Sequence, residues 1–448
     1  MPGTLARTLG LRDLILIVVG TVIGSGIFTV PGAVLRQTEG DVGVALLVWL
    51  LGGALSLVGA LAYGELGAML PEAGGGYVYI REAFGPLPAF LLGWTLFLVI
   101  GTGSMATLAV AFSNYLDQLV TLGPRQAKVA AVLMIAAVGA VNVKGTRDSA
   151  RVQGWSTAIK VGAILVVGGG ALALGDGLAA LPARVFTAPL GLPLLSGVGL
   201  ATIGVLWAYE GWSNMAANAG EEIDPQRTFP RGMVVGTAAL IGIYLFANVG
   251  YLAALGPERV AGTDRVAAVA VSALFGPTAG RLVAVAILVS MFSATNGLIL
   301  TTSRVYYAMA RDGLFFRRLA LVHPRFGTPA LAIVAGSAWA MLLAVTGKFE
   351  ELFTYVIFAA WAFYALGVAS VLVLRRRRPE AVRPFRVPGY PVTPWLFILA
   401  AGAIVVNTIV ARPGRSGLGL GIILAGVPAY FWWRRASVSG GHTVLPRV

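Results

Sequence analysis

The chain has 448 residues, of which 57% are hydrophobic and 12% are charged, whereas a typical soluble domain has about 25% charged residues. This composition excludes an ordinary soluble domain, which needs more polar surface, and a disordered chain, which needs low hydrophobicity and high charge. The formal net charge of +14 indicates basic cytoplasmic loops of a membrane protein, so no nucleic-acid partner is expected.

Twelve apolar runs are long enough to be membrane helices, because a bilayer core about 30 Å thick needs about 20 apolar residues per helix. They cover residues 12–36, 43–69, 86–116, 127–143, 152–174, 194–219, 231–255, 278–310, 329–347, 350–374, 393–411 and 416–433. The sequence therefore predicts an all-α integral membrane protein with 12 transmembrane helices, surrounded by the lipid bilayer.

The distribution of Lys and Arg predicts the orientation of these helices. If the N-terminus is cytoplasmic, 22 of these cations fall in cytoplasmic segments, 10 fall outside, and Lys160 lies within a span. Because cytoplasmic loops carry the excess of Lys and Arg, we expect both termini in the cytoplasm, and we expect the protein in the plasma (inner) membrane.

The first run is interrupted near its middle by Gly24-Ser25-Gly26, and glycine weakens a helix by about 1 kcal/mol per residue. One interpretation is close helix packing, which small residues serve in membranes. The other is a break in the helix, which exposes the N–H groups that begin its second half. These N–H groups and the positive end of the helix dipole would attract a carboxylate near Ser25, Gly26 and Ile27.

Lys160 lies about eight residues into the fifth run. One interpretation is that its long side chain reaches the cytoplasmic surface. The other is that its ammonium group occupies the place of a sodium ion. It would then bond carbonyl groups of the first helix near Gly20 to Ile23, and the hydroxyl groups of Ser290 and Ser293 in the eighth helix. In that position it could also carry a coupling proton.

The sixth run contains a carboxylate, a glycine and a hydroxyl in the stretch Trp207 to Asn214. A charge at mid-bilayer costs at least about 2.5 kcal/mol, so Glu210 must face protein or water, be paired, or be protonated. A structural carboxylate bonded to a neighbouring helix would satisfy this requirement. A helix break here would instead expose carbonyl groups near Trp207 to Glu210, which attract an ammonium group or a metal cation.

Runs one and six occupy the same place in two successive blocks of five helices. Paired interruptions at corresponding positions are the sequence sign of an inverted-repeat transporter with its site at the midplane. N–H groups from one break and C=O groups from the other would suit a zwitterion with both charges on one carbon. The sequence therefore predicts an α-amino acid as the substrate.

Several motifs, in order along nearly the whole chain, resemble the amino acid–polyamine–organocation superfamily, and within it the L-type amino acid transporter branch of bacterial permeases. These motifs are residues 24–28, 112–115, 208–212, 293–297, 302–304, 310–313 and 383–391. The resemblance implies a LeuT-type fold of 5+5 inverted repeats plus two C-terminal helices, with helices 1 and 6 unwound at mid-membrane, and transport by alternating access. The repeats would be residues 1–174 and 175–377, followed by two helices and a cytoplasmic tail in 378–448.

The resemblance also implies roles for particular residues. Ser25, Gly26 and Ile27 would hold the substrate carboxylate. The amino group would be held at Ile23, Trp207, Ala208 and Glu210, and Trp207 would be an aromatic gate over a pocket that includes Tyr209, Gly211 and Ser213. Lys160 matches the lysine of helix five in the family, with Gly20, Ser290 and Ser293 around it.

The sequence favours a sodium-independent exchanger or permease of neutral amino acids, because the expected pocket is otherwise apolar. Two alternatives stay open: a proton-coupled symporter using Lys160, and a carrier of cationic amino acids or polyamines using Glu210. An intramembrane enzyme is disfavoured, because no partner base for Glu210 is evident. A channel is disfavoured too, because no row of pore-lining charges is present.

The chain contains no cysteine and only two histidines, His323 and His442, both in polar segments. Thiolate metal sites, disulfides and a buried haem are therefore excluded, and we expect no metal and no cofactor. Animal members of the branch are linked to a heavy chain by a cysteine in the loop after helix three. We therefore expect no disulfide-linked heavy chain here.

Overall fold

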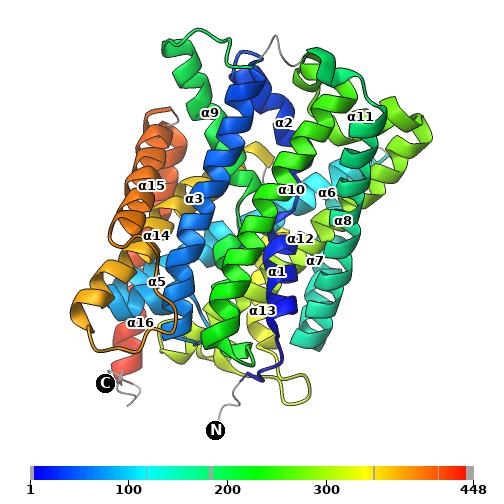
Figure 1. Cartoon of the computed structure of the whole chain (residues 1–448). Helices are drawn as coiled ribbons and strands as arrows, with labels where there is room; N and C mark the ends of the chain where they lie inside the picture. Colours follow the sequence, from blue (N-terminus) through cyan, green and yellow to red (C-terminus); the bar gives the residue numbers. More distant parts are fainter. Residues whose placement is uncertain (1–4, 118, 181–184, 347–348, 412, 440–448) are drawn as a thin grey trace.

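The apolar runs become a bundle of long helices in the computed structural model, which describes residues 5–117, 119–180, 185–346, 349–411 and 413–439 (Figure 1). Helices suit these runs because lipid offers no hydrogen-bond partners, and a helix pairs its backbone N–H and C=O groups within its own segment. Ten helices of the described ranges are long and apolar enough to cross a membrane, and one bent pair is an eleventh candidate. The chain is therefore an all-α, multi-pass membrane protein.

Long α-helices and a few short helical turns make up the described chain. In chain order they are α1 (Leu11–Val22), α2 (Gly26–Gln37), α3 (Val42–Met69), α4 (Gly76–Phe84), α5 (Pro86–Thr95), the π-helical turn η1 (Leu96–Ile100), α6 (Gly101–Leu116), α7 (Pro124–Lys144), α8 (Thr146–Leu174), η2 (Gly177–Ala180), α9 (Leu192–Ala208), the 3-10 helix η4 (Trp212–Glu221), α10 (Pro225–Ala261), α11 (Val266–Phe275), α12 (Pro277–Arg311), η5 (Arg317–Ala320), α13 (Ala330–Thr346), α14 (Phe349–Arg377), α15 (Val392–Ala411) and α16 (Pro413–Ser439).

The first apolar run is two helices rather than one. α1 ends at Val22, α2 begins at Gly26, and the two axes differ by 48°. Figure 1 shows α1 in the lower half of the bundle and α2 above it in the upper half. α1 begins and α16 ends at the lower end, which we call the terminal side.

The sixth apolar run also changes its backbone in the middle. α9 stops at Ala208, and Gly211 adopts the left-handed backbone with φ +113°. Glycine reaches this conformation without a steric penalty because it has no Cβ. The chain then continues as the 3-10 helix η4 up to Glu221.

Two short helices lie between the runs that the sequence predicts as spans. In the glycine-rich segment after α3, Gly74 and Gly75 form a turn with positive φ, and α4 begins directly after it. α11, which has ten residues, lies between α10 and α12. α13, at 17 residues, is shorter than the ten spanning helices.

The interruptions lie inside the bundle because long helices pack around them. α1 packs against α8, α10 and α12, and α2 packs against α9 and α10. η4 contacts α1, α3 and α12. As a result, every residue of the break from Ile23 to Ile27 is buried.

Candidate substrate site

The two interruptions touch each other. A Cβ atom at Gly26 would lie 2.6 Å from Cα of Ala208, so the start of α2 packs directly on the end of α9. A Cβ atom at Gly211 would lie 3.3 Å from Cγ2 of Thr21, near the end of α1. Glycine therefore stands at two contacts between the broken segments, and at Gly26 a side chain would not fit.

The start of α2 offers hydrogen-bond donors without helical partners. The first N–H groups of a helix have no intrahelical acceptor, and the Ser25 side chain makes no capping bond to them. The Ser25 hydroxyl is itself buried and has no hydrogen-bond partner among the described residues. With the positive end of the helix dipole, this group of donors suits a carboxylate.

The carbonyl groups at the ends of α1 and α9 are already engaged. The hydroxyl of Tyr244, on α10, lies 2.8 Å from the carbonyl oxygen of Ala208 and 3.2 Å from that of Val22. The backbone N–H of Glu210 donates to the carbonyl of Trp207 at 3.0 Å. Because a carbonyl oxygen has two lone pairs, a carbonyl that accepts one such bond can accept a second from an ammonium group.

Lys160 is buried, with 1% of its surface exposed, so it does not reach the surface. Its Nζ donates to the carbonyl oxygens of Gly20 at 2.6 Å and Ile23 at 2.7 Å. Ser290 donates to Ile23 at 3.0 Å, and Ser293 accepts a bond from the Ser156 hydroxyl. The structure thus brings Lys160, Gly20 and Ser290 together at the end of α1. Ser293 is on α12, like Ser290, but its hydrogen bond is with Ser156 of α8.

A cavity of about 30 Å³ lies between the two breaks. Its walls include Ser25 and Gly26 but not Ile27, together with the expected gate residue Trp207 and side chains from α6 and α12. The lining residues are Thr21, Val22, Gly24, Ser25, Gly26, Ser104, Leu108, Trp207, Glu210 and Leu298. The cavity therefore brings Ser25 and Gly26 of the first break beside Trp207 and Glu210 of the sixth run.

Glu210 is bonded to a residue of a second cavity, whose walls include Gly74 and Gly76 in the turn that follows α3, and α3 ends on the terminal side. Its Oε1 accepts a hydrogen bond from the hydroxyl of Tyr364, on α14, and its Oε2 is buried without a partner among the described residues. Tyr364 and Ser213 line the second cavity, of about 40 Å³. Ser213 therefore belongs to the second cavity rather than to the first.

Tyr209 does not line either of these cavities. Its ring packs against Tyr244, with the ring centroids 4.9 Å apart, and against Trp49. Gly211 forms the turn that begins η4. These two residues shape the break in the sixth run, and neither of them lines the cavity beside Ser25.

Sequence reasoning missed three features around the breaks. Tyr244 and Tyr364 gave no signal, because tyrosine is common in apolar helices. The third is the ion pair between Glu221 and Arg304, in which Arg304 donates through Nε at 2.7 Å and through Nη2 at 2.9 Å, with both side chains at most 1% exposed. Arg304 is one of the 22 cations that the charge count in the sequence analysis assigns to cytoplasmic segments. Its place within the eighth apolar run was the signal for burial.

Two interrupted helices that meet beside a small cavity in a membrane bundle are features of a solute carrier, and the comparisons with known proteins support this class. The amino acid permease family matches residues 9–431. The serine/threonine exchanger SteT of Bacillus subtilis is 33% identical over 441 residues, which cover 97% of this chain and 98% of that protein.

Two human proteins are similar at nearly full length. The large neutral amino acids transporter small subunit 2 is 33% identical over 434 residues, covering 95% of this chain and 80% of that protein. The Asc-type amino acid transporter 1 is 31% identical over 447 residues, covering 96% of this chain and 83% of that protein. The chain belongs to the amino acid permease family, in the amino acid–polyamine–organocation superfamily. Like its relatives it is a transporter and not an enzyme.

Proposed function

We propose that the protein is a sodium-independent exchanger of neutral L-amino acids that works by alternating access. The observation that carries this proposal is the contact between the start of α2 and the end of α9. Beside this contact lies a cavity lined by Ser25, whose hydroxyl has no hydrogen-bond partner among the described residues. The relatives named as a serine/threonine exchanger and as a transporter of large neutral amino acids support the same activity.

In the proposed architecture, the chain has 12 spans in a LeuT-type arrangement. The bent pair α1 and α2 counts as the first span, and the short helix α13 as the ninth. Residues 1–174 form one inverted repeat, residues 175–377 form the other, and residues 378–448 add two helices and a tail. The breaks at Ile23–Ser25 and Tyr209–Gly211 are then the unwound centres of helices 1 and 6.

In the proposed binding mode, the substrate carboxylate accepts hydrogen bonds from Ser25 and from the N–H groups of Gly26 and Ile27. The substrate ammonium donates to the carbonyl oxygens of Trp207 and Ala208. The carbonyl of Ile23 already accepts from both Lys160 and Ser290, so it acts through Lys160 rather than as a direct ligand. Trp207 closes the cavity over the side chain.

Lys160 explains independence from sodium. Its ammonium bonds two carbonyl groups at the end of α1, where a bound sodium ion would supply the same positive charge. A side-chain ammonium group at this place would supply the charge without a coupling ion. The alternative is that Lys160 exchanges a proton during the cycle, which would make the protein a proton symporter.

The Glu210 carboxylate supports a second candidate function. Its Oε2 is buried without a partner in the described part of the chain, and an unpaired buried acceptor costs about 1–3 kcal/mol. A cationic substrate side chain would relieve this cost. Transport of cationic amino acids or polyamines is therefore the alternative to neutral substrates.

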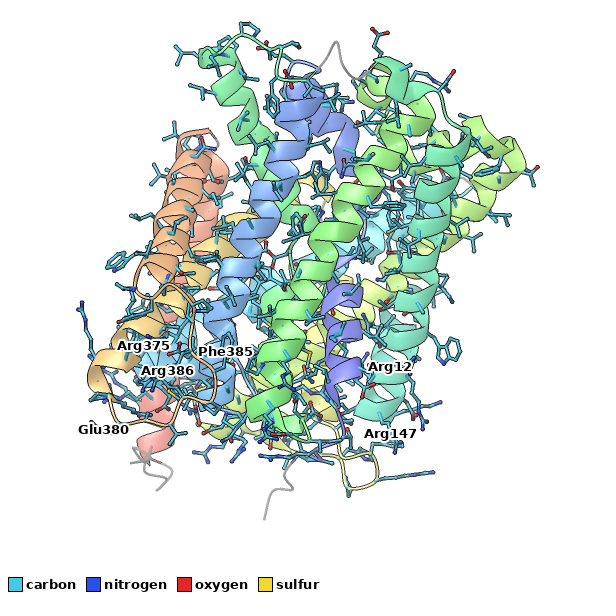
Figure 2. The ribbon with its side chains drawn as sticks, viewed as in Figure 1. Arg12, Arg147, Arg375, Glu380, Phe385 and Arg386 are labelled. Carbon is cyan, nitrogen blue, oxygen red and sulfur yellow. The ribbon has the colours of Figure 1, made fainter. Side chains whose placement is uncertain are left out.

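We propose that the terminal side is cytoplasmic and that the protein lies in the plasma membrane. Basic side chains such as Arg12, Arg147, Arg375 and Arg386 lie at this end of the bundle (Figure 2), and cytoplasmic loops are enriched in such residues. Because the chain has no cysteine, it works without a disulfide-linked partner.

Counterflow in proteoliposomes tests the proposed function. Liposomes loaded with unlabelled serine, alanine or leucine should accelerate uptake of the same labelled amino acid, without sodium and without a pH gradient. Uptake driven by an inward proton gradient, with no stimulation from inside, would show symport instead. Faster exchange of lysine than of any neutral amino acid would show the cationic alternative.

A further inference from the structure

Glu222 is a buried carboxyl group that the proposed transport site does not use. It lies between η4 and α10, and none of its surface is exposed. Its Oε2 accepts a hydrogen bond from the Thr228 hydroxyl at 3.0 Å. Its Oε1 is buried and has no hydrogen-bond partner among the described residues.

The N-terminal segment Thr8–Gly10, which we call the strap, covers this region. The backbone N–H groups of Thr8 and Leu9 donate to the carbonyl of Glu221 at 2.8 Å and 3.0 Å, and Ile223 donates back to Leu9 at 3.0 Å. These bonds form the isolated bridge between Leu9 and Glu222. The strap thus ties the start of the chain to the segment that follows η4.

The groups that the described chain places around Glu222 leave its charge uncompensated. On its own segment, the neighbouring residue Glu221 is paired with Arg304 of α12. From α10 it faces the neutral Thr228. From α4 the Tyr79 hydroxyl interacts with it electrostatically, and this hydroxyl is also buried without a partner among the described residues.

A carboxylate with one neutral donor is poorly stabilised away from water. Burial therefore raises the pKa of Glu222 to about 8, although the hydrogen bond from Thr228 opposes the shift. In this buried position, the carboxyl group is mostly protonated at neutral pH. The protonated form can also donate a hydrogen bond, which the ionised form cannot.

We propose that Glu222 is a proton-binding site that is occupied while the terminal side is closed and that releases its proton to the adjacent water when that side opens. The inference rests on the alternating access of the proposed function. Opening moves the strap and η4 apart, so water reaches the carboxyl group, its O–H bond breaks, and the proton passes to that water. Closing takes one proton back.

The sign of the pH dependence follows from the linkage between proton binding and opening. The closed state binds more protons than the open state between the ordinary pKa of a glutamate, about 4.3, and the raised value of about 8. Raising the pH through this window therefore favours opening, by up to about tenfold per pH unit. Above the raised value, both states are ionised and the dependence ends.

A single engineered cysteine measures the opening directly, because the natural chain has none. Asn214 lines the cavity on the terminal side, so Asn214→Cys reports access of a thiol reagent from that side. Its labelling rate is measured from pH 6 to pH 9, alone and with Glu222→Gln. The rate for Asn214→Cys alone is divided by the rate for Asn214→Cys with Glu222→Gln. This ratio cancels the titration of the thiol itself.

This ratio should rise about tenfold or more from pH 6 to pH 8 and then level off. Glu222→Gln imitates the protonated group, so the terminal side of this variant should stay closed at every pH. Glu380→Gln, which changes an exposed acid at the same end, should leave the rise intact. Thr228→Val removes the donor to the carboxylate, and it should move the midpoint to higher pH.

A ratio that stays constant with pH would overturn the proposal, and so would a midpoint that Thr228→Val leaves in place. If Glu222→Gln does not fold, the shift in Thr228→Val decides alone. Labelling needs no substrate, so a failure of the proton site is distinguishable from a failure of amino acid exchange. Absence of counterflow with a normal pH-dependent ratio would reject the transport proposal only.

Discussion

At the scale of single residues, the contact between the two breaks depends on a missing side chain. A Cβ atom at Gly26 would meet both Cα and Cβ of Ala208 within 2.7 Å. These are backbone and near-backbone atoms, so neither can move aside without separating α2 from α9. The size of residue 26 therefore controls the geometry of the proposed site.

We expect Gly26→Val to remove substrate binding, because its branched side chain would force the start of α2 away from Ala208. Thermal-shift titration with the transported amino acid measures the effect, and the stabilisation by substrate should disappear. Gly242→Val is the matched control, since residue 242 is exposed and a Cβ atom there meets nothing within 4 Å. Undiminished affinity in Gly26→Val would place the carboxylate elsewhere.

Lys160 acts on the same break from the other side. We expect Lys160→Ala to reduce exchange to near background while the protein still inserts into the membrane, because the carbonyl groups of Gly20 and Ile23 lose their shared donor. Exchange in proteoliposomes and the amount of folded protein are measured together. Lys144→Ala, which changes an exposed lysine at the end of α7, should behave as wild type. Normal exchange without Lys160 would contradict an ionic role.

At the scale of elements, α10 connects the two broken runs. One hydroxyl, that of Tyr244, is within hydrogen-bond distance of the last turns of both α1 and α9. α10 also packs along α3, and it begins just after Glu222. A movement of α10 would therefore reach both breaks and the segment of Glu222 together.

We expect Tyr244→Phe to lower the free energy of unfolding by about 1–3 kcal/mol, because buried acceptors lose their donor. The variant should also exchange amino acids more slowly, since the ends of α1 and α9 are no longer joined. Thermal unfolding in detergent and counterflow measure the two effects. Tyr115→Phe removes a buried hydroxyl that has no partner among the described residues, so it should change neither the stability nor the exchange rate. An equal loss of stability in both variants would contradict a role for the Tyr244 hydroxyl.

At the scale of the whole molecule, the basic residues predict which end faces the cytoplasm. Leu190 lies before α9, at the end opposite the terminal side, and is 94% exposed; Val382 lies after α14 on the terminal side and is 78% exposed. In intact cells, an impermeant thiol reagent should label Leu190→Cys and spare Val382→Cys until the membrane is opened. The reverse pattern would overturn the proposed orientation.

Several particular features were predictable because their causes are local. Gly24 and Gly26 weaken a helix wherever it lies, and Lys160 is unfavourable in an apolar run in any fold. A lysine buried in a bundle also needs acceptors, and a broken helix supplies them as unpaired carbonyl groups. The engagement of the Ala208 carbonyl by Tyr244 was not predictable, because the two residues are 36 positions apart and belong to different helices.

The sequence by itself determined that lipid surrounds this protein, where the apolar helices run, and where two of them are weak, because hydropathy and glycine content act within a few residues. The tertiary structure alone decided which groups meet at those weak points: Tyr364 on Glu210, Arg304 on Glu221, and the strap over Glu222. These contacts depend on how each helix is rotated and tilted against its neighbours. That rotation is the result of packing over the whole bundle, which no short stretch of sequence encodes.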